Sequence, residues 1–84
     1  MQNEETSSLH DLLQFLVRGL VDRPNEVRIS EIPGDQATTY EIAVDPTDRG
    51  KVIGKHGRIA NALRVVARSV ANRHRQRVNV EIVT

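Results

Sequence analysis

The chain contains no cysteine among its 84 residues, so it has no disulfide framework, no thiolate metal site and no cysteine nucleophile. Tryptophan is also absent, and Phe15 and Tyr40 are its only aromatic residues, which excludes binding on a platform of stacked rings. No apolar run approaches the roughly 20 residues of a membrane helix, and the N-terminus lacks the basic and apolar regions of a signal peptide. We therefore expect one small cytoplasmic domain without membrane contact.

The net charge of +1 conceals a strong asymmetry along the chain. Residues 1–48 carry ten acidic and three basic residues, a formal charge of −7, whereas residues 49–84 carry nine basic residues and one acidic residue, a charge of +8. Such asymmetry favours a polyanionic partner. A basic helix that is simply solvated is the alternative, and charge alone leaves both open.

A helix is predicted from Ser8, a suitable N-cap, to about Asp22, because Pro24 disfavours helical geometry in the residue before it. Its apolar residues recur at helical spacing and form one stripe, consisting of Leu9, Leu12, Leu13, Leu16 and Leu20. Phe15 lies off that stripe, so it is either half-covered by a loop or a candidate for a protein contact. The polar residues 1–7 before the helix are expected to form a disordered tail.

The middle of the chain reads as a β-hairpin, with strands at residues 26–32 and 38–44 around a Pro-Gly turn. Asp45 and Pro46 then begin a short helix, a longer helix runs from Gly57 to about His74, and residues 77–83 form a last strand. This order predicts an α+β fold, α-β-β-α-α-β, whose three-stranded mixed sheet has helices packed on one face. The last strand should lie parallel to the second.

The long helix has a predicted core stripe of Ile59, Leu63, Val66 and Val70. Three arginines, Arg64, Arg68 and Arg75, are expected on the opposite side, either as a solvated back face or as a second polyanion contact. The histidines outside the glycine loop, His10 and His74, are expected on the solvated surface.

The segment with chemical content is Val52-Ile53-Gly54-Lys55-His56-Gly57-Arg58-Ile59. Gly54 can end the first helix with a positive φ, and the free N–H groups at the start of the next helix make an anion site, to which Lys55 adds charge. A P-loop is excluded, because only three residues separate Gly50 from Gly54 and His56 follows the lysine. A plain helix–turn–helix joint remains the alternative.

An Ile-Gly-x-x-Gly segment between two helices, preceded by a hairpin and followed by a strand, resembles a type II KH domain. A chain made of little else, about residues 8–83 of 84, is similar to the small bacterial single-KH RNA-binding proteins of the KhpA (YlqC-like) family. The resemblance implies that residues 8–84 form one KH domain. It also implies that Gly54, Lys55, His56 and Gly57 hold the phosphates of about four unpaired nucleotides, while bases lie in an adjacent groove. Ile53 would support the loop from the core, and Lys51 and Arg58 are added to the site by proximity alone.

The resulting hypothesis is a single-stranded RNA-binding protein, an RNA chaperone or post-transcriptional regulator, that needs no cofactor. The alternative is a protein-interaction or ribonucleoprotein assembly module that binds little RNA itself. An enzyme is the weakest class, because no metal cluster, nucleophile–base pair or cofactor motif can be assembled from the sequence. The resemblance further implies a homodimer, or a heterodimer with a larger KhpB/Jag-like KH protein, and Phe15 is our candidate for the dimer contact.

Overall fold

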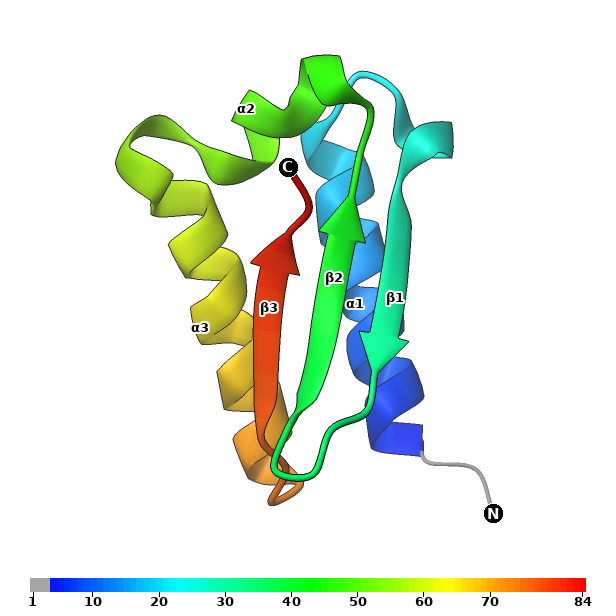
Figure 1. Ribbon diagram of the computed structural model, residues 1–84, viewed down its shortest axis with the longest axis vertical. Coiled ribbons are helices and arrows are strands. Elements are labelled where there is room, and N and C mark those ends of the chain that lie inside the picture. Colours follow the sequence, from blue (N-terminus) through cyan, green and yellow to red (C-terminus); the bar gives the residue numbers. More distant parts are fainter. Residues whose placement is uncertain (1–3) are drawn as a thin grey trace.

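The computed structural model describes residues 4–84, with side chains described from Ser8 onward. Three helices pack on one face of a three-stranded mixed sheet (Figure 1), which confirms the predicted α+β fold and element order. The elements are α1 (Glu4–Leu20), β1 (Arg28–Ile32), β2 (Thr38–Ala43), α2 (Arg49–Ile53), α3 (Arg58–Arg73) and β3 (Val78–Ile82). Among these described residues, no helix is both long enough and apolar enough to cross a membrane.

Strand β2 lies at the centre of the sheet, between β1 and β3. It pairs with β1 as an antiparallel hairpin, in which Ile29 lies opposite Ile42. It pairs with β3 in parallel, as predicted, with Tyr40 beside Val80. Because β2 and β3 run in the same direction, the chain between them must cross back over one face, and α2 and α3 form that crossover.

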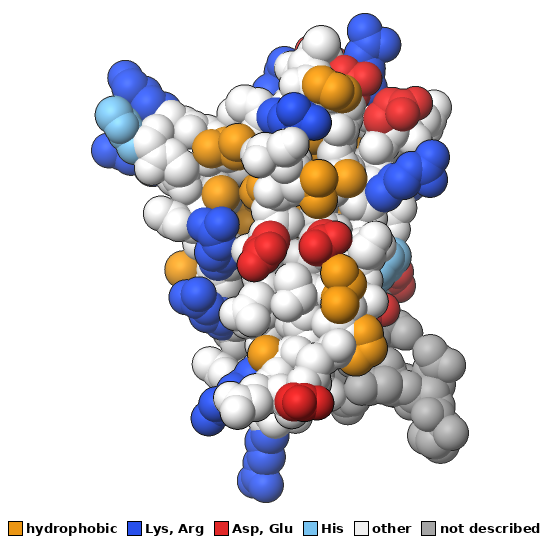
Figure 2. Space-filling model, viewed as in Figure 1, with side chains coloured by type: hydrophobic (Ala, Val, Ile, Leu, Met, Phe, Trp, Pro, Cys, Tyr) orange, Lys and Arg blue, Asp and Glu red, His pale blue; other side chains and the backbone are white. Residues whose placement is uncertain are grey.

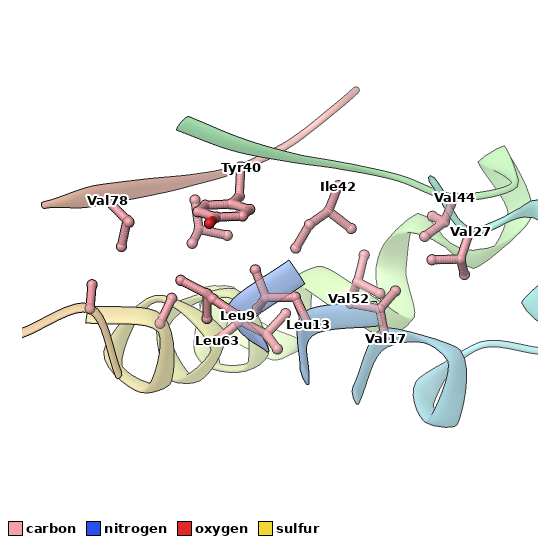
Figure 3. Packing of buried hydrophobic residues seen from close by; sticks show 13 residues of the cluster. Leu9, Leu13, Val17, Val27, Tyr40, Ile42, Val44, Val52, Leu63 and Val78 are labelled. Atoms are coloured by element: carbon pink, nitrogen blue, oxygen red, sulfur yellow. The ribbon is translucent and has the colours of Figure 1, made fainter. Parts of the chain in front are cut away.

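The core fills the space between the sheet and the helices (Figure 3). Alternation along β2 directs Tyr40 and Ile42 toward the helices, and both are buried, as predicted. Facing them, α1 contributes Leu9, Leu13 and Val17, all with at most 2% of their surface exposed. No helix within residues 4–84 covers the other face of the sheet (Figure 1), and Glu41 and Glu81 are paired in register on β2 and β3.

The buried face of α3 differs from the predicted one. Its buried residues are Ala60, Leu63, Ala67 and Ala71, so of the predicted stripe only Leu63 is fully buried. Ile59 and Val70 are partly buried at its border, and Val66 is 37% exposed. Small side chains at the line of closest contact let α3 pack tightly, and the larger branched residues flank that line.

Two further predictions about α1 are corrected. The helix begins at Glu4, four residues before the predicted cap at Ser8. His10 is partly buried rather than fully solvated, and its Nε2 atom donates a hydrogen bond to the carbonyl oxygen of Ile29 (3.1 Å) on the outer edge of β1. Residues 4–7 of the predicted disordered tail belong to α1, and its residues 1–3 lie outside the described part of the chain, so disorder there stays a prediction.

Candidate nucleic-acid interface

The loop between α2 and α3 is held at a fixed place by the elements before it. Asp45 caps a 3₁₀ turn over Pro46–Asp48, because its carboxylate accepts hydrogen bonds from the backbone N–H (3.0 Å) and hydroxyl of Thr47. These two hydrogen bonds, with the nearby charge of Arg23, lower the pKa of Asp45 below its usual value. The chain then enters α2, where Val52 is fully buried and fixes the helix on the core.

The loop has a backbone that favours glycine at both ends. Gly54 has φ 78° and ψ 170°, and Gly57 has φ 74° and ψ 16°, which are conformations that L side chains rarely adopt. Between them, His56 also has a left-handed backbone, with φ 57°. A non-glycine residue held with positive φ in an exposed loop is a common property of functional turns.

The start of α3 combines the positive end of a helix with exposed basic side chains. Its N-cap residue is Gly57, which offers no capping side chain. The N–H groups of Gly57 and Arg58 donate to the carbonyl oxygens of Gly54 and Lys55, and the positive end of the helix dipole lies beside the loop. Lys55, His56 and Arg58 surround this helix start and are all exposed. The loop projects from the body of the molecule (Figure 1), and Figure 2 shows basic and histidine side chains gathered at that projection.

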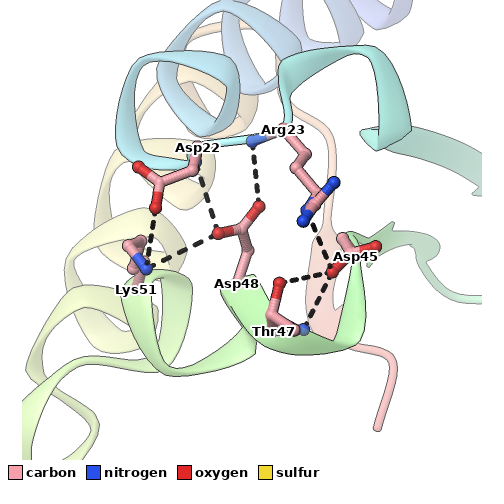
Figure 4. A network of polar contacts seen from close by, with 6 residues as sticks. All are labelled: Asp22, Arg23, Asp45, Thr47, Asp48 and Lys51. Atoms are coloured by element: carbon pink, nitrogen blue, oxygen red, sulfur yellow. Dashed lines mark hydrogen bonds and ion pairs between the residues drawn. The ribbon is translucent and has the colours of Figure 1, made fainter.

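Lys51, also predicted at the site, makes its contacts elsewhere. Its Nζ atom lies 3.3 Å from Asp22 Oδ2 and 3.6 Å from Asp48 Oδ1 (Figure 4). The hydrogen bond and charge of Asp22, and then those of Asp48, raise the pKa of Lys51 above its usual value. The structure thus joins Lys51 to the C-terminal end of α1 and leaves its predicted contact with RNA untested, whereas Lys55, His56 and Arg58 share one surface.

Asp48 is a structural residue that the sequence reasoning missed. An acidic residue at a helix start is expected to face solvent beside the helix dipole, yet the side chain of Asp48 is 1% exposed. Its carboxylate accepts hydrogen bonds from the backbone N–H groups of Asp22 (3.3 Å) and Arg23 (3.0 Å). Nothing in the sequence around Asp48 indicates that its partners, Asp22 and Arg23, lie 26 and 25 residues earlier in the chain.

Arg64 does not lie on a solvated back face. It is partly buried, and its Nε atom donates a hydrogen bond to the carbonyl oxygen of Val80 (3.1 Å) on β3, while its Nη1 atom donates one to Asn61 Oδ1 (3.1 Å). Arg68, one turn further along α3, is exposed. Figure 2 shows Lys and Arg side chains along the flank of the molecule that α3 forms. The chain's basic half is therefore concentrated on the side that carries the loop.

Phe15 lies on α1, with 75% of its surface exposed. It borders a shallow depression of about 600 Å³ on that helix, which Asp11 and Arg18 also line. Leu16 and Leu20 connect this depression to a second, apolar one of about 310 Å³ between α1 and α3. Phe15 therefore lies on the exposed surface of the helical layer.

The fold and the loop together define a class of domain. A hairpin, two helices joined by a Gly-x-x-Gly turn, and a final strand parallel to β2 form a type II KH domain. Residues 10–82 match the family model described as "KhpA/KhpB, KH domain", and the chain belongs to this family.

Individual relatives agree with that assignment. The chain is 47% identical over 75 residues to a protein of Clostridium acetobutylicum named RNA-binding protein KhpA, and the alignment covers 89% of this chain and all of the relative. A protein of the same name from Chlamydia pneumoniae is 44% identical over 75 residues, covering 89% of this chain and 96% of the relative. A crystal structure of Era from Aquifex aeolicus is similar in fold alone, with a TM-score of 0.59 at 21% identity, covering 88% of this chain and 29% of that one.

Proposed function

We propose that this protein binds single-stranded RNA by clamping its phosphate backbone on the loop between Gly54 and Gly57. The observation that carries the proposal is the start of α3, which has no side-chain cap and is surrounded by the exposed side chains of Lys55, His56 and Arg58. Backbone N–H groups and neighbouring cations are the donors that phosphate oxygens require. The relatives named RNA-binding proteins support the same conclusion.

Bases would be read without aromatic stacking. The chain has one Tyr and one Phe, and Tyr40 is 1% exposed while Phe15 lies on α1. Recognition therefore depends on hydrogen bonds and on contact with aliphatic side chains beside the loop. This favours unpaired nucleotides, whose base edges are accessible, over a duplex whose deep groove hides them.

The loop clamp is tested by fluorescence anisotropy of a labelled unstructured RNA across a salt series. The variant Lys55→Asp/His56→Asp places two negative charges beside the phosphates, so we expect it to remain folded and to lose binding. For the unaltered protein, log K should fall with log salt with a slope of about −0.7 for each phosphate neutralised, or about −2 for three.

A matched control separates a local effect from a change in net charge. Arg28→Asp/Gln36→Asp changes the formal charge by the same amount at two exposed positions outside the loop, on β1 and in the hairpin turn. This control should keep most of the affinity at moderate salt. If the loop variant and the control bind RNA equally well, the clamp is wrong.

We further propose that the protein acts in the cytoplasm as an RNA chaperone or post-transcriptional regulator, and that it does so without a cofactor. A pair of linked domains would raise its effective affinity for RNA, and the exposed Phe15 on α1 is the proposed contact of a homodimer, or of a heterodimer with a KhpB-like protein. A folded protein that binds no RNA even at low salt would instead support an assembly module that requires its partner.

A further inference from the structure

One face of α3 combines polar, basic and apolar side chains next to the last strand. Asn61, Arg64, Val65 and Arg68 follow the i, i+3, i+4, i+7 spacing of a single helical face. The hydrogen bond from Arg64 to Val80 locates this face along the outer edge of β3. Val65 is 60% exposed on this face.

Arg64 is oriented by fixed acceptors on two elements. A guanidinium group has five N–H donors, and Arg64 uses one of them on Val80 and one on Asn61. Within the described side chains it forms no ion pair with a carboxylate, so its other three N–H groups have no described partner. Because two bonds already hold the planar group in place, little conformational entropy is lost when those groups bind a ligand.

The position of Arg64 suits a base better than a phosphate. It lies six residues after Arg58, on the second turn of α3, whereas the proposed phosphate site is at the start of that helix. Val65 adds an exposed aliphatic surface on the same face, and a ligand with both an apolar face and hydrogen-bonding edges would use both residues. A nucleobase has this combination, and an inorganic anion does not.

We propose that Arg64, oriented by Asn61 and Val80, determines base specificity by selecting an unpaired base with two adjacent acceptor atoms on one edge. Guanine presents O6 and N7, and cytosine presents O2 and N3. On its Watson–Crick and Hoogsteen edges adenine presents the N6 donor beside one acceptor, and uracil presents the N3 donor beside both of its carbonyl oxygens, so a donor on these edges opposes an arginine N–H. This proposal rests on the proposed RNA-binding function and adds to it the base that the site prefers.

The test measures binding of four labelled U-rich hexamers that differ at one central position, which is A, C, G or U. We expect the unaltered protein to prefer G or C there by about tenfold. Arg64→Lys keeps the positive charge but loses the planar guanidinium group with its paired N–H donors. The preference for G or C should therefore fall below twofold, while affinity for the all-U hexamer changes little. Replacing guanine by 7-deazaguanine removes N7, and a loss of affinity would identify guanine as the base.

Two variants separate specificity from general effects. Arg68→Lys makes the same substitution one turn away, at an exposed arginine, and should keep the base preference. Asn61→Ala leaves Arg64 in place but removes one of its acceptors, so it should weaken the preference in part; it also serves if Arg64→Lys is poorly folded. The absence of a base preference in the unaltered protein, or an unchanged preference in Arg64→Lys, would overturn the proposal, while failure to bind all four RNAs would overturn the RNA-binding function with it.

Discussion

The two glycines of the loop are required for different physical reasons. A Cβ atom on Gly54 would lie 2.7 Å from Ile59 Cγ1 and 2.9 Å from the backbone nitrogen of Ile59, so the loop could not pack on α3. A Cβ atom on Gly57 would meet no atom within 4 Å. Gly57 is therefore constrained by its positive φ alone, whereas Gly54 is constrained by both φ and close packing.

Alanine substitutions should separate these two constraints. Gly57→Ala should lower the free energy of unfolding by about 1–2 kcal/mol, the usual cost of a left-handed alanine. Gly54→Ala should cost more, because overpacking against Ile59 adds about 1–3 kcal/mol. Urea unfolding measures both values. Gly57→Asn serves as the control, since asparagine tolerates this conformation better than alanine, and equal losses for the two alanine variants would contradict the distinction.

At the scale of the elements, a small polar network fixes α2 and therefore the loop that follows it. The buried carboxylate of Asp48 binds the backbone N–H groups that follow α1, and Lys51 reaches Asp22 from α2. The end of α1 and the start of α2 are thus joined at one point, immediately before the glycine loop (Figure 4). Loss of this joint should loosen the loop relative to the sheet.

Asp48→Asn is the variant that tests the joint. An asparagine has the same shape, but its amide N–H₂ group would face one of the two backbone donors that the carboxylate now satisfies. One donor left unsatisfied in a buried place costs about 1–3 kcal/mol, which we expect as a loss in the free energy of unfolding by urea. Asp35→Asn, at the exposed tip of the hairpin, should change it by less than about 0.5 kcal/mol; similar losses in both variants would contradict a structural role for Asp48.

Much of the fold follows from local sequence signals, because those signals report backbone geometry. The Pro-Gly turn, the alternation of Tyr40 and Ile42, and the cap at Asp45 each specify a local conformation, and all three are confirmed. The rotation of α3 was not predictable in this way. A prediction from apolar periodicity places the large apolar residues at the centre of the buried face. In α3 the line of closest packing is instead occupied by alanines such as Ala67.

The candidate site was predicted less completely than the fold. The positive φ angle of Gly54 was predicted from its place at the end of a helix, whereas that of Gly57 was not predicted. The partners of Lys51 and Arg64 were not, because Asp22 and Val80 are distant in the sequence and become neighbours only after the sheet and helices have packed. Proximity along the chain placed Lys51 at the loop, and its contact with RNA stays a prediction beside the ion pairs that the structure adds.

At the scale of the whole molecule, the charge asymmetry of the sequence survives folding. The long axis of the domain is 37 Å, and basic side chains accompany α3 along one flank (Figure 2). Glu41 and Glu81 are paired in register on neighbouring strands of the sheet. We therefore expect an RNA strand to be attracted to the α3 flank rather than to the open sheet. We expect the exposed surface of α1 to contact protein.

The exposed side of α1 is expected to mediate self-association. Asp11 and Arg18 are two turns apart on the exposed side of α1, with Phe15 between them. An antiparallel two-fold pair of α1 helices would bring each Asp11 opposite Arg18 of the partner subunit and bury both Phe15 rings. Phe15→Glu should therefore shift the protein to monomers in sedimentation equilibrium, and Arg18→Asp should weaken the dimer less. Asp11→Arg/Arg18→Asp restores the complementary charges and should recover association, because the two-fold pairing only exchanges their positions. Unchanged sedimentation of Phe15→Glu would exclude this surface.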